Sequence, residues 1–94
     1  MTLRNILRVT LADGRFAEID TEGQSLNVFE PDGSKLFMVA PPEHAGFYQF
    51  ARHAVHGECP IVSFEPGHAI NGWTDWYYRV DVSGQFVERL NPWR

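Results

Sequence analysis

Apolar and polar residues alternate over much of the chain, and this alternation predicts β-strands. Within residues 5–11, the alternating apolar residues are Leu7, Val9 and Leu11. The residues between them, Arg8 and Thr10, are polar. That spacing is typical of a strand with one buried face. Asp13-Gly14 follows directly and predicts a hairpin turn into a second strand.

The length of this first turn decides which residues face each other. A three-residue turn at 12–14, with Gly14 in the left-handed region, places apolar residues opposite apolar residues and Arg8 opposite Glu18. The apolar pairs expected from that register are Leu7 with Ile19 and Val9 with Ala17. A two-residue turn would shift every pair by one position and is the alternative.

Two further strands, 26–30 and 35–39, flank the turn Pro31-Asp32-Gly33. Proline first and glycine last favour a type I turn followed by a G1 bulge. The pairs expected from this turn are Val28 with Leu36 and Leu26 with Met38. Four strands joined by short turns therefore predict an antiparallel meander.

The segment from Pro41 to Gly57 has a different period and predicts an amphipathic helix. Proline suits the first helical turn, and Gly57 followed by Pro60 suits the helix end. Large or small apolar residues recur at helical spacing, at Phe47, Phe50, Ala51, Ala54 and Val55. We expect this apolar stripe to pack on one face of a sheet.

After the predicted helix, three further strands are expected: a short buried one at 60–64, a long alternating one at 76–82 and a final one at 86–90. The fold class expected from the whole pattern is α+β, with the order β-β-β-β-α-β-β-β along the chain. An antiparallel sheet would carry the single amphipathic helix on one face, and residues 1–94 would form one domain. The order of strands between the two halves stays open.

Composition and charge argue against several classes of protein for this sequence, among them nucleic-acid-binding, disulfide-bonded and membrane-spanning proteins. The net charge is −4, and the pI is near 5.4, so no basic surface for nucleic acid is expected. The single cysteine excludes an intrachain disulfide and suits a reducing compartment. Arg4 and Arg8 interrupt the first apolar residues, and no apolar run approaches the ~20 residues of a membrane span. These features predict a cytoplasmic protein without a membrane segment.

Two histidines and the cysteine are the candidates for metal binding or nucleophilic chemistry. His53, His56 and Cys59 are spaced by three, and imidazole and thiolate are good zinc ligands. Cys59 beside a histidine could also form a thiolate–imidazole pair, and Glu65, His68 or Asp75 could act in acid–base chemistry. The spacing matches no standard zinc motif, so solvated histidines and a small buried Cys59 are the simpler interpretation. We therefore predict no metal and no other cofactor.

The segment 65–76 is the longest irregular stretch, and such loops are often functional. It offers an aromatic wall with polar groups, the usual composition of a small-ligand pocket. The candidate ligand-binding residues are His68, Asn71, Trp73 and Asp75. The alternative is that Trp73 and Trp76 turn inward and fix the loop to the core.

A protein partner, or a second copy of the chain, could bind at two other places. Glu18, Asp20 and Glu22 alternate and would project from one face as an acidic ridge. Tyr77 on the last hairpin and Trp93 near the chain end are residue types enriched at interfaces. The alternative for the acidic residues is a solvated sheet edge that resists aggregation.

These observations give three functional hypotheses. The leading one is a small non-enzymatic interaction protein, inhibitor- or immunity-like, that acts through protein–protein contacts. The second is a small-molecule-binding domain with its pocket at the 65–76 loop and the seam between helix and sheet. The third is a small hydrolase or metal-binding protein.

Overall fold

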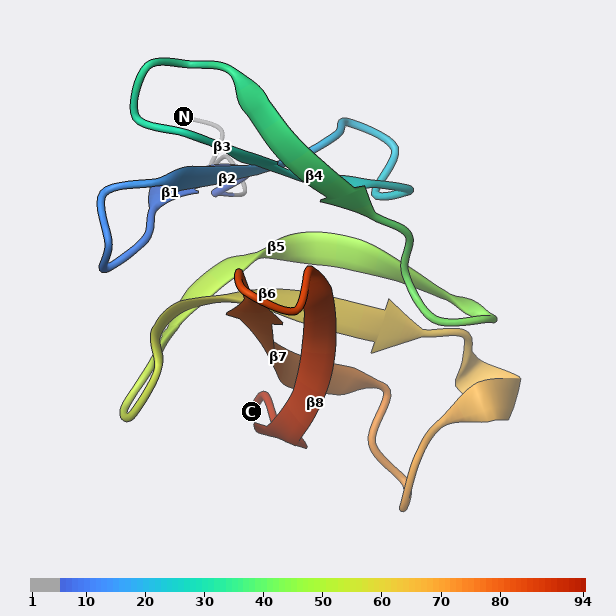
Figure 1. Cartoon of the computed structure of the whole chain (residues 1–94). Coiled ribbons are helices and arrows are strands. Elements are labelled where there is room, and N and C mark those ends of the chain that lie inside the picture. The colour runs from blue at the N-terminus through green and yellow to red at the C-terminus, as the bar shows by residue number, and fades with distance from the viewer. Residues whose placement is uncertain (1–5) are drawn as a thin grey trace, which may run out of the picture.

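Two four-stranded antiparallel sheets, packed face to face, make up the fold of this computed structural model (Figure 1). The structure describes residues 6–94, so Asn5 of the first expected strand and the Arg4 interruption lie outside it. The elements are β1 (Arg8–Thr10), β2 (Phe16–Ile19), β3 (Leu26–Phe29), β4 (Lys35–Val39), β5 (Ala45–His53), β6 (Gly57–Phe64), the short 3₁₀ turn η1 (Pro66–His68), β7 (Asp75–Asp81) and β8 (Phe86–Pro92). The strands follow one another in chain order within each sheet, β1 to β4 and β5 to β8.

The first hairpin has the expected register. Val9 lies opposite Ala17 and Arg8 opposite Glu18, and the Ile19 amide donates to the carbonyl of Leu7 over 2.8 Å. Arg8 and Glu18 also form an ion pair of 3.7 Å across the two strands. The three-residue turn is therefore confirmed, with the glycine at its end in the left-handed region (φ 91°).

The register between β3 and β4 differs from the prediction by one residue. The turn itself is as expected, since Gly33 has a φ of 93° and its amide donates to the Glu30 carbonyl. A second irregularity follows between Val28 and Phe29, and it places Leu36 as an extra residue in β4. The observed apolar pairs are Val28 with Phe37 and Leu26 with Val39. Phe37 therefore faces the core, while Met38 is 61% exposed.

The predicted amphipathic helix over 41–57 is wrong, and the fold is all-β rather than α+β. The segment forms β5 and the turn into β6, which pair antiparallel along most of their length. A bulge between Phe47 and Gln49 leaves Tyr48 as an extra residue. Because of this bulge, Phe47 and Phe50 both face the core although they are three residues apart. The spacing that resembled a helical stripe is thus a strand pattern with one residue inserted.

The last two residues of the expected apolar stripe also lie outside any helix. Ala54 and Val55 lie in the turn, and Val55 is 79% exposed. His44 has a φ of 61°, which is incompatible with a helix starting at the prolines before it. Gly57, expected as a helix cap, instead takes its left-handed conformation in the β5–β6 turn (φ 71°).

The three predicted strands of the second half are confirmed as parts of β6, β7 and β8. Pro92 lies at the end of β8, which is an edge strand where proline is tolerated. Over residues 6–94 the sole helical segment is η1, and no helix there is long and apolar enough to cross a membrane.

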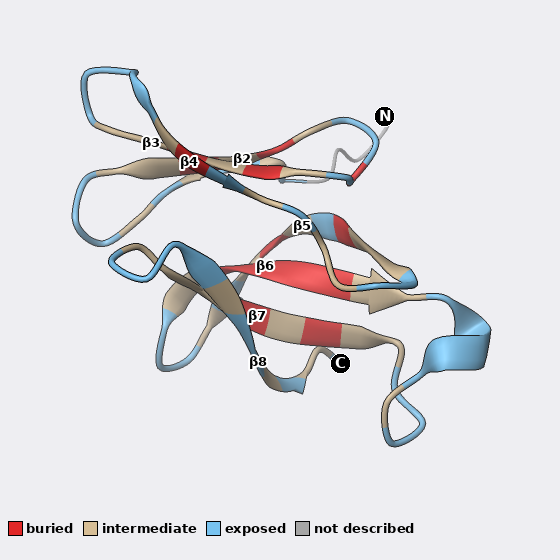
Figure 2. Ribbon diagram, turned by 45° about the vertical axis from the view of Figure 1, so that its right-hand side comes forward, coloured by how far each residue is buried: buried red, intermediate tan, exposed pale blue. Residues whose placement is uncertain are grey.

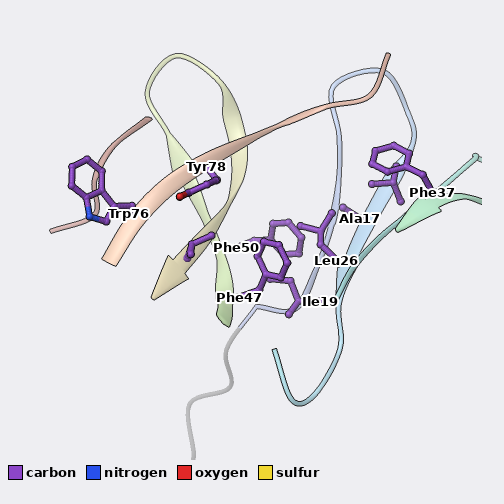
Figure 3. Close-up of a cluster of buried hydrophobic side chains, with 10 residues drawn as sticks. Ala17, Ile19, Leu26, Phe37, Phe47, Phe50, Trp76 and Tyr78 are labelled. Atoms are coloured by element: carbon purple, nitrogen blue, oxygen red, sulfur yellow. The ribbon is translucent and has the colours of Figure 1, made fainter. Parts of the chain in front are cut away.

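The main core lies between the inner faces of the two sheets. Buried residues concentrate in the middle of the strands, and most of the turn residues are exposed (Figure 2). Phe47 from the second sheet packs beside Ile19 and Leu26 from the first (Figure 3). The buried members of this core are Ala17, Ile19, Leu26, Val28, Phe37, Phe47, Phe50, Val62, Trp76 and Tyr78.

Backbone hydrogen bonds also join the sheets. The Phe47 amide donates to the Gly23 carbonyl over 2.8 Å, and the Phe50 amide donates to the Ile6 carbonyl over 2.7 Å. The edge of β5 that does not face β6 is therefore bonded to the first sheet. Gly23 is buried there with a φ of 73°, and a Cβ atom added to it would lie 2.4 Å from the Phe47 carbonyl oxygen.

The second sheet also has a buried outer face. Cys59 and Ile61 are buried but alternate with the core residues of β6, so they face away from the first sheet. His53 on β5 hydrogen-bonds Asn91 on β8 over 2.7 Å, although these strands are at opposite edges of the sheet. The sheet is thus curled so that its two edges meet over this face.

Candidate functional site: an inter-sheet cleft

A cleft of about 390 Å³ opens where the β1–β2 turn faces the β5–β6 turn. Both turns lie at the same end of the sandwich, and the loop around η1 lies at the other end (Figure 1). The lining comes from β1 and its turn, from the β5–β6 hairpin and from β7, namely Thr10, Leu11, Ala12, Asp13, Arg52, His56, Gly57, Glu58, Cys59, Arg79, Val80 and Val82.

Strand alternation explains the mixed character of this cleft. Phe50 and Pro60 pair within the core, and the next pair on the same strand face is Arg52 with Glu58. That pair lies just beyond the core, at its mouth, where charged side chains can reach water. On β7, Val80 follows the buried Tyr78 on the same face and continues the apolar surface outward.

Apolar side chains from both sheets line the cleft. Leu11, at the start of the β1–β2 turn, and Val82, just after β7, both pack against the core. Together with Val80 they form the apolar part of the lining, while Arg52 and Glu58 form its charged part. The cleft can therefore offer one surface to an aliphatic group and another to a charged group.

Two of the four charged residues in the lining are engaged by other parts of the protein. Arg79 bonds to Glu88 and, over 3.3 Å, to Asp81, and these carboxylates raise the pKa of its guanidinium. Asp13 accepts from the backbone and side chain of Arg15 over 3.0 and 2.7 Å, and these bonds lower the pKa of its carboxyl. Both groups have their charge compensated within the fold.

Arg52 and Glu58 are less constrained. Their closest atoms, Nη1 and Oε1, are 3.5 Å apart, which is longer than a good charge-assisted hydrogen bond of about 2.7–2.9 Å. The Arg52 side chain is 81% exposed and that of Glu58 is 29% exposed. The guanidinium is therefore free to turn toward a ligand in the cleft.

A second hollow of about 640 Å³ adjoins the first and shares Ala12, Arg52, His56 and Gly57 with it. Tyr77 and the β5–β6 turn complete its lining. Sequence reasoning placed Tyr77 in a partner surface, and the structure places it here, where its hydroxyl donates to the Arg52 carbonyl over 3.2 Å.

The imidazole of His53 holds the β5–β6 turn in place. Its Nδ1 accepts the backbone N–H groups of Val55 and His56 over 3.0 and 3.2 Å. Nε2 must then carry the proton, which it donates to Oδ1 of Asn91 over 2.7 Å. Both ring nitrogens of His53 are thus engaged, and its ring stands edge-on to that of Tyr77, with the ring centroids 4.8 Å apart.

The possible metal ligands His53, His56 and Cys59 all lie in the β5–β6 hairpin at this end of the sandwich, rather than on a helix. His53 has no free nitrogen, and Cys59 is buried. Burial, with a smaller contribution from Glu58, raises the pKa of the Cys59 thiol to about 11. Within residues 6–94 no three histidine, cysteine or carboxylate side chains gather around a point where a metal ion could bind.

The four ligand-binding candidates of the 65–76 loop lie at the other end and line neither hollow. His68 stacks on His44 with ring centroids 3.7 Å apart, and Asn71 occupies a left-handed turn position (φ 51°). Asp75 accepts from the Ser63 hydroxyl over 2.7 Å. Trp73 is 41% exposed, and the Arg94 guanidinium lies 4.8 Å from its ring.

Most of the partner-binding candidates have structural contacts. Glu18 pairs with Arg8, and Asp20 accepts from the Gln24 amide and the Ser25 hydroxyl within its own turn. Those turn bonds lower the pKa of the Asp20 carboxyl. Glu22 is exposed, and Trp93 packs against Tyr48 with ring centroids 5.9 Å apart.

Sequence reasoning missed the cleft residues Arg52, Glu58, Val80 and Val82. One signal was present, because Arg52 and Glu58 carry opposite charges and lie at matching distances from the turn. That signal is readable only when 45–64 is treated as a hairpin.

No protein-family description, curated protein or solved structure matches the chain.

Proposed function

We propose that the protein is a small binding domain that holds a small organic molecule in the inter-sheet cleft. The observation that supports this proposal is the cleft itself, where an apolar surface meets an incompletely paired arginine and glutamate. Its volume falls within the roughly 300–1,000 Å³ range of small-molecule sites. The proposal keeps the small-molecule hypothesis and moves its site from the 65–76 loop to the opposite end.

The cleft is favoured over the acidic partner surface because it is a hollow that brings charged and apolar groups together. Asp20, on the acidic surface, already accepts from the Gln24 amide and the Ser25 hydroxyl within its own turn. Arg52 instead projects into solvent at the mouth of the cleft. A recognition site needs such unsatisfied donors and acceptors, since engaged ones must first be released.

The experiment is a fragment titration followed by ¹⁵N–¹H correlation spectra of the labelled protein. Fragments that bind in the cleft should shift the amides of Ala12 and Gly57, which line both hollows. The amide of Gly72, in the loop at the other end, is the internal control. A Val82→Trp variant that fills the cleft should abolish the shifts while keeping a folded spectrum. Fragments that shift Gly72 and leave Ala12 and Gly57 unchanged would contradict the proposal.

A further inference from the structure

We propose that the cleft recognises an α-amino acid with an aliphatic side chain. This inference rests on the proposed function and names the class of ligand. It comes from the four charged residues in the lining, two cationic and two anionic, whose formal charges cancel. They are Arg52, Arg79, Asp13 and Glu58.

Two of these four charged residues are bound to other parts of the protein, so one cation and one anion in the lining remain for a ligand. Arg79 is compensated by Glu88 and Asp81, and Asp13 is compensated by Arg15. A ligand with a single charge would satisfy either Arg52 or Glu58 and leave the other without a partner. A ligand with one positive and one negative group satisfies both Arg52 and Glu58. Its two charges each bind one of these side chains, in place of the weak 3.5 Å contact between Arg52 and Glu58.

The geometry limits the distance between the two ligand charges. Arg52 and Glu58 are directly opposite on neighbouring strands, so their Cβ atoms are about 4.5–5.5 Å apart. Charges that bind to adjacent side chains must be separated by few bonds. The carboxylate and ammonium groups of an α-amino acid meet this condition, whereas the separated charges of a long zwitterion do not.

The side-chain preference follows from the apolar part of the lining. Leu11, Val80 and Val82 come from both sheets and would contact an aliphatic group from two sides. The carboxylate would accept two parallel N–H bonds from the Arg52 guanidinium, and the ammonium group would donate to the Glu58 carboxylate. The guanidinium, which is mostly exposed, can rotate to meet the ligand.

Three probes of the same carbon skeleton test the inference. Leucine carries both charges, 4-methylpentanoate lacks the ammonium group, and 3-methylbutylamine lacks the carboxylate. Titration of each probe into the labelled protein should show leucine binding about tenfold tighter than either analogue, followed through the Ala12 and Gly57 amides. Arg52→Gln and Glu58→Gln should each weaken leucine binding about tenfold, whereas Glu65→Gln and Arg94→Gln, at charged positions outside the cleft lining, should leave it unchanged.

Several results would overturn the inference without removing the cleft as a site. If 4-methylpentanoate binds as tightly as leucine, the ligand class is a simple anion. If 3-methylbutylamine does so, it is a simple cation. If fragments of another class shift the Ala12 and Gly57 amides and all three probes do not, the amino-acid assignment is wrong while the proposed function stands. If no fragment shifts these amides, both fail together.

Discussion

Gly23 is the position where one methyl group should most clearly disturb the junction between the two sheets. The residue has a left-handed φ of 73°, and an alanine there costs about 1–2 kcal/mol in backbone strain alone. Its added Cβ would lie 2.4 Å from the Phe47 carbonyl oxygen, which is backbone and cannot move aside as a side chain could. Relief of that overlap costs about 1–3 kcal/mol, and the Gly23–Phe47 hydrogen bond adds about 0.5–1.5 kcal/mol if it breaks. We expect Gly23→Ala to lower the free energy of unfolding by about 3–5 kcal/mol.

Gly33 supplies a matched control. Its amide closes the same kind of turn, from Glu30, that the Gly23 amide closes from Asp20. Its φ is 93°, but an added Cβ would meet nothing within 4 Å. Gly33→Ala should therefore cost only the backbone strain, about 1–2 kcal/mol.

Urea unfolding of both variants, followed by tryptophan fluorescence, measures the difference. We expect the cost of Gly23→Ala to exceed that of Gly33→Ala by at least ~1.5 kcal/mol, with similar m-values if both variants fold. A Gly23→Ala protein too unstable to fold, beside a folded Gly33→Ala, agrees with the same reasoning. Equal costs for the two variants would refute the close contact between the β2–β3 turn and β5.

Three further predictions concern single side chains. His53→Ala removes the acceptor of two turn amides and a bond to β8, and it should lower the free energy of unfolding by about 1–2 kcal/mol in urea titrations. His68→Ala should cost less than about 0.5 kcal/mol, because that ring stacks on the surface; equal costs would contradict the role of His53. Cys59 should react slowly with a thiol reagent at pH 8 in the native state and quickly in guanidinium, because its buried thiol has a pKa of about 11; rapid native labelling would contradict its burial. The pKa of Asp20 is lowered from 3.8, chiefly by the Gln24 amide, so the carboxylate stabilises the fold above about pH 4 and this contribution is lost as the pH falls through the folded pKa. Thermal unfolding of Asp20→Asn should thus depend less on pH between about 4 and 2 than that of the wild type; identical pH profiles would contradict it.

The parts of the fold that could be predicted from sequence are those governed by local turns. The register of Arg8 with Glu18 follows from one three-residue turn and strict alternation. Bulges cause the two errors, since each inserts a residue that alternation cannot reveal. At Tyr48 the inserted residue converts a two-residue period into the i, i+3 spacing of Phe47 and Phe50, which is also the spacing of a helix.

The cleft could not be predicted because it depends on contacts distant in sequence. Leu11 and Val80 lie on different sheets, and only their packing across the core brings them to one cavity. The spacing of His53, His56 and Cys59 makes them candidates for metal binding or nucleophilic chemistry, and they do lie at this end of the sandwich. The ring nitrogens of His53 are engaged and the Cys59 thiol is buried, and both properties depend on the β5–β6 pairing and on Asn91 of β8.

A crystallographic fragment screen is the sharpest test of ligand binding in the cleft, because it locates each binding site without a prior choice of ligand. We expect bound fragments to concentrate in the cleft, in contact with Arg52, Glu58 or Val82. Fragments that gather around Trp73 and the 65–76 loop, in crystals whose cleft is open to solvent and stays empty, would contradict it.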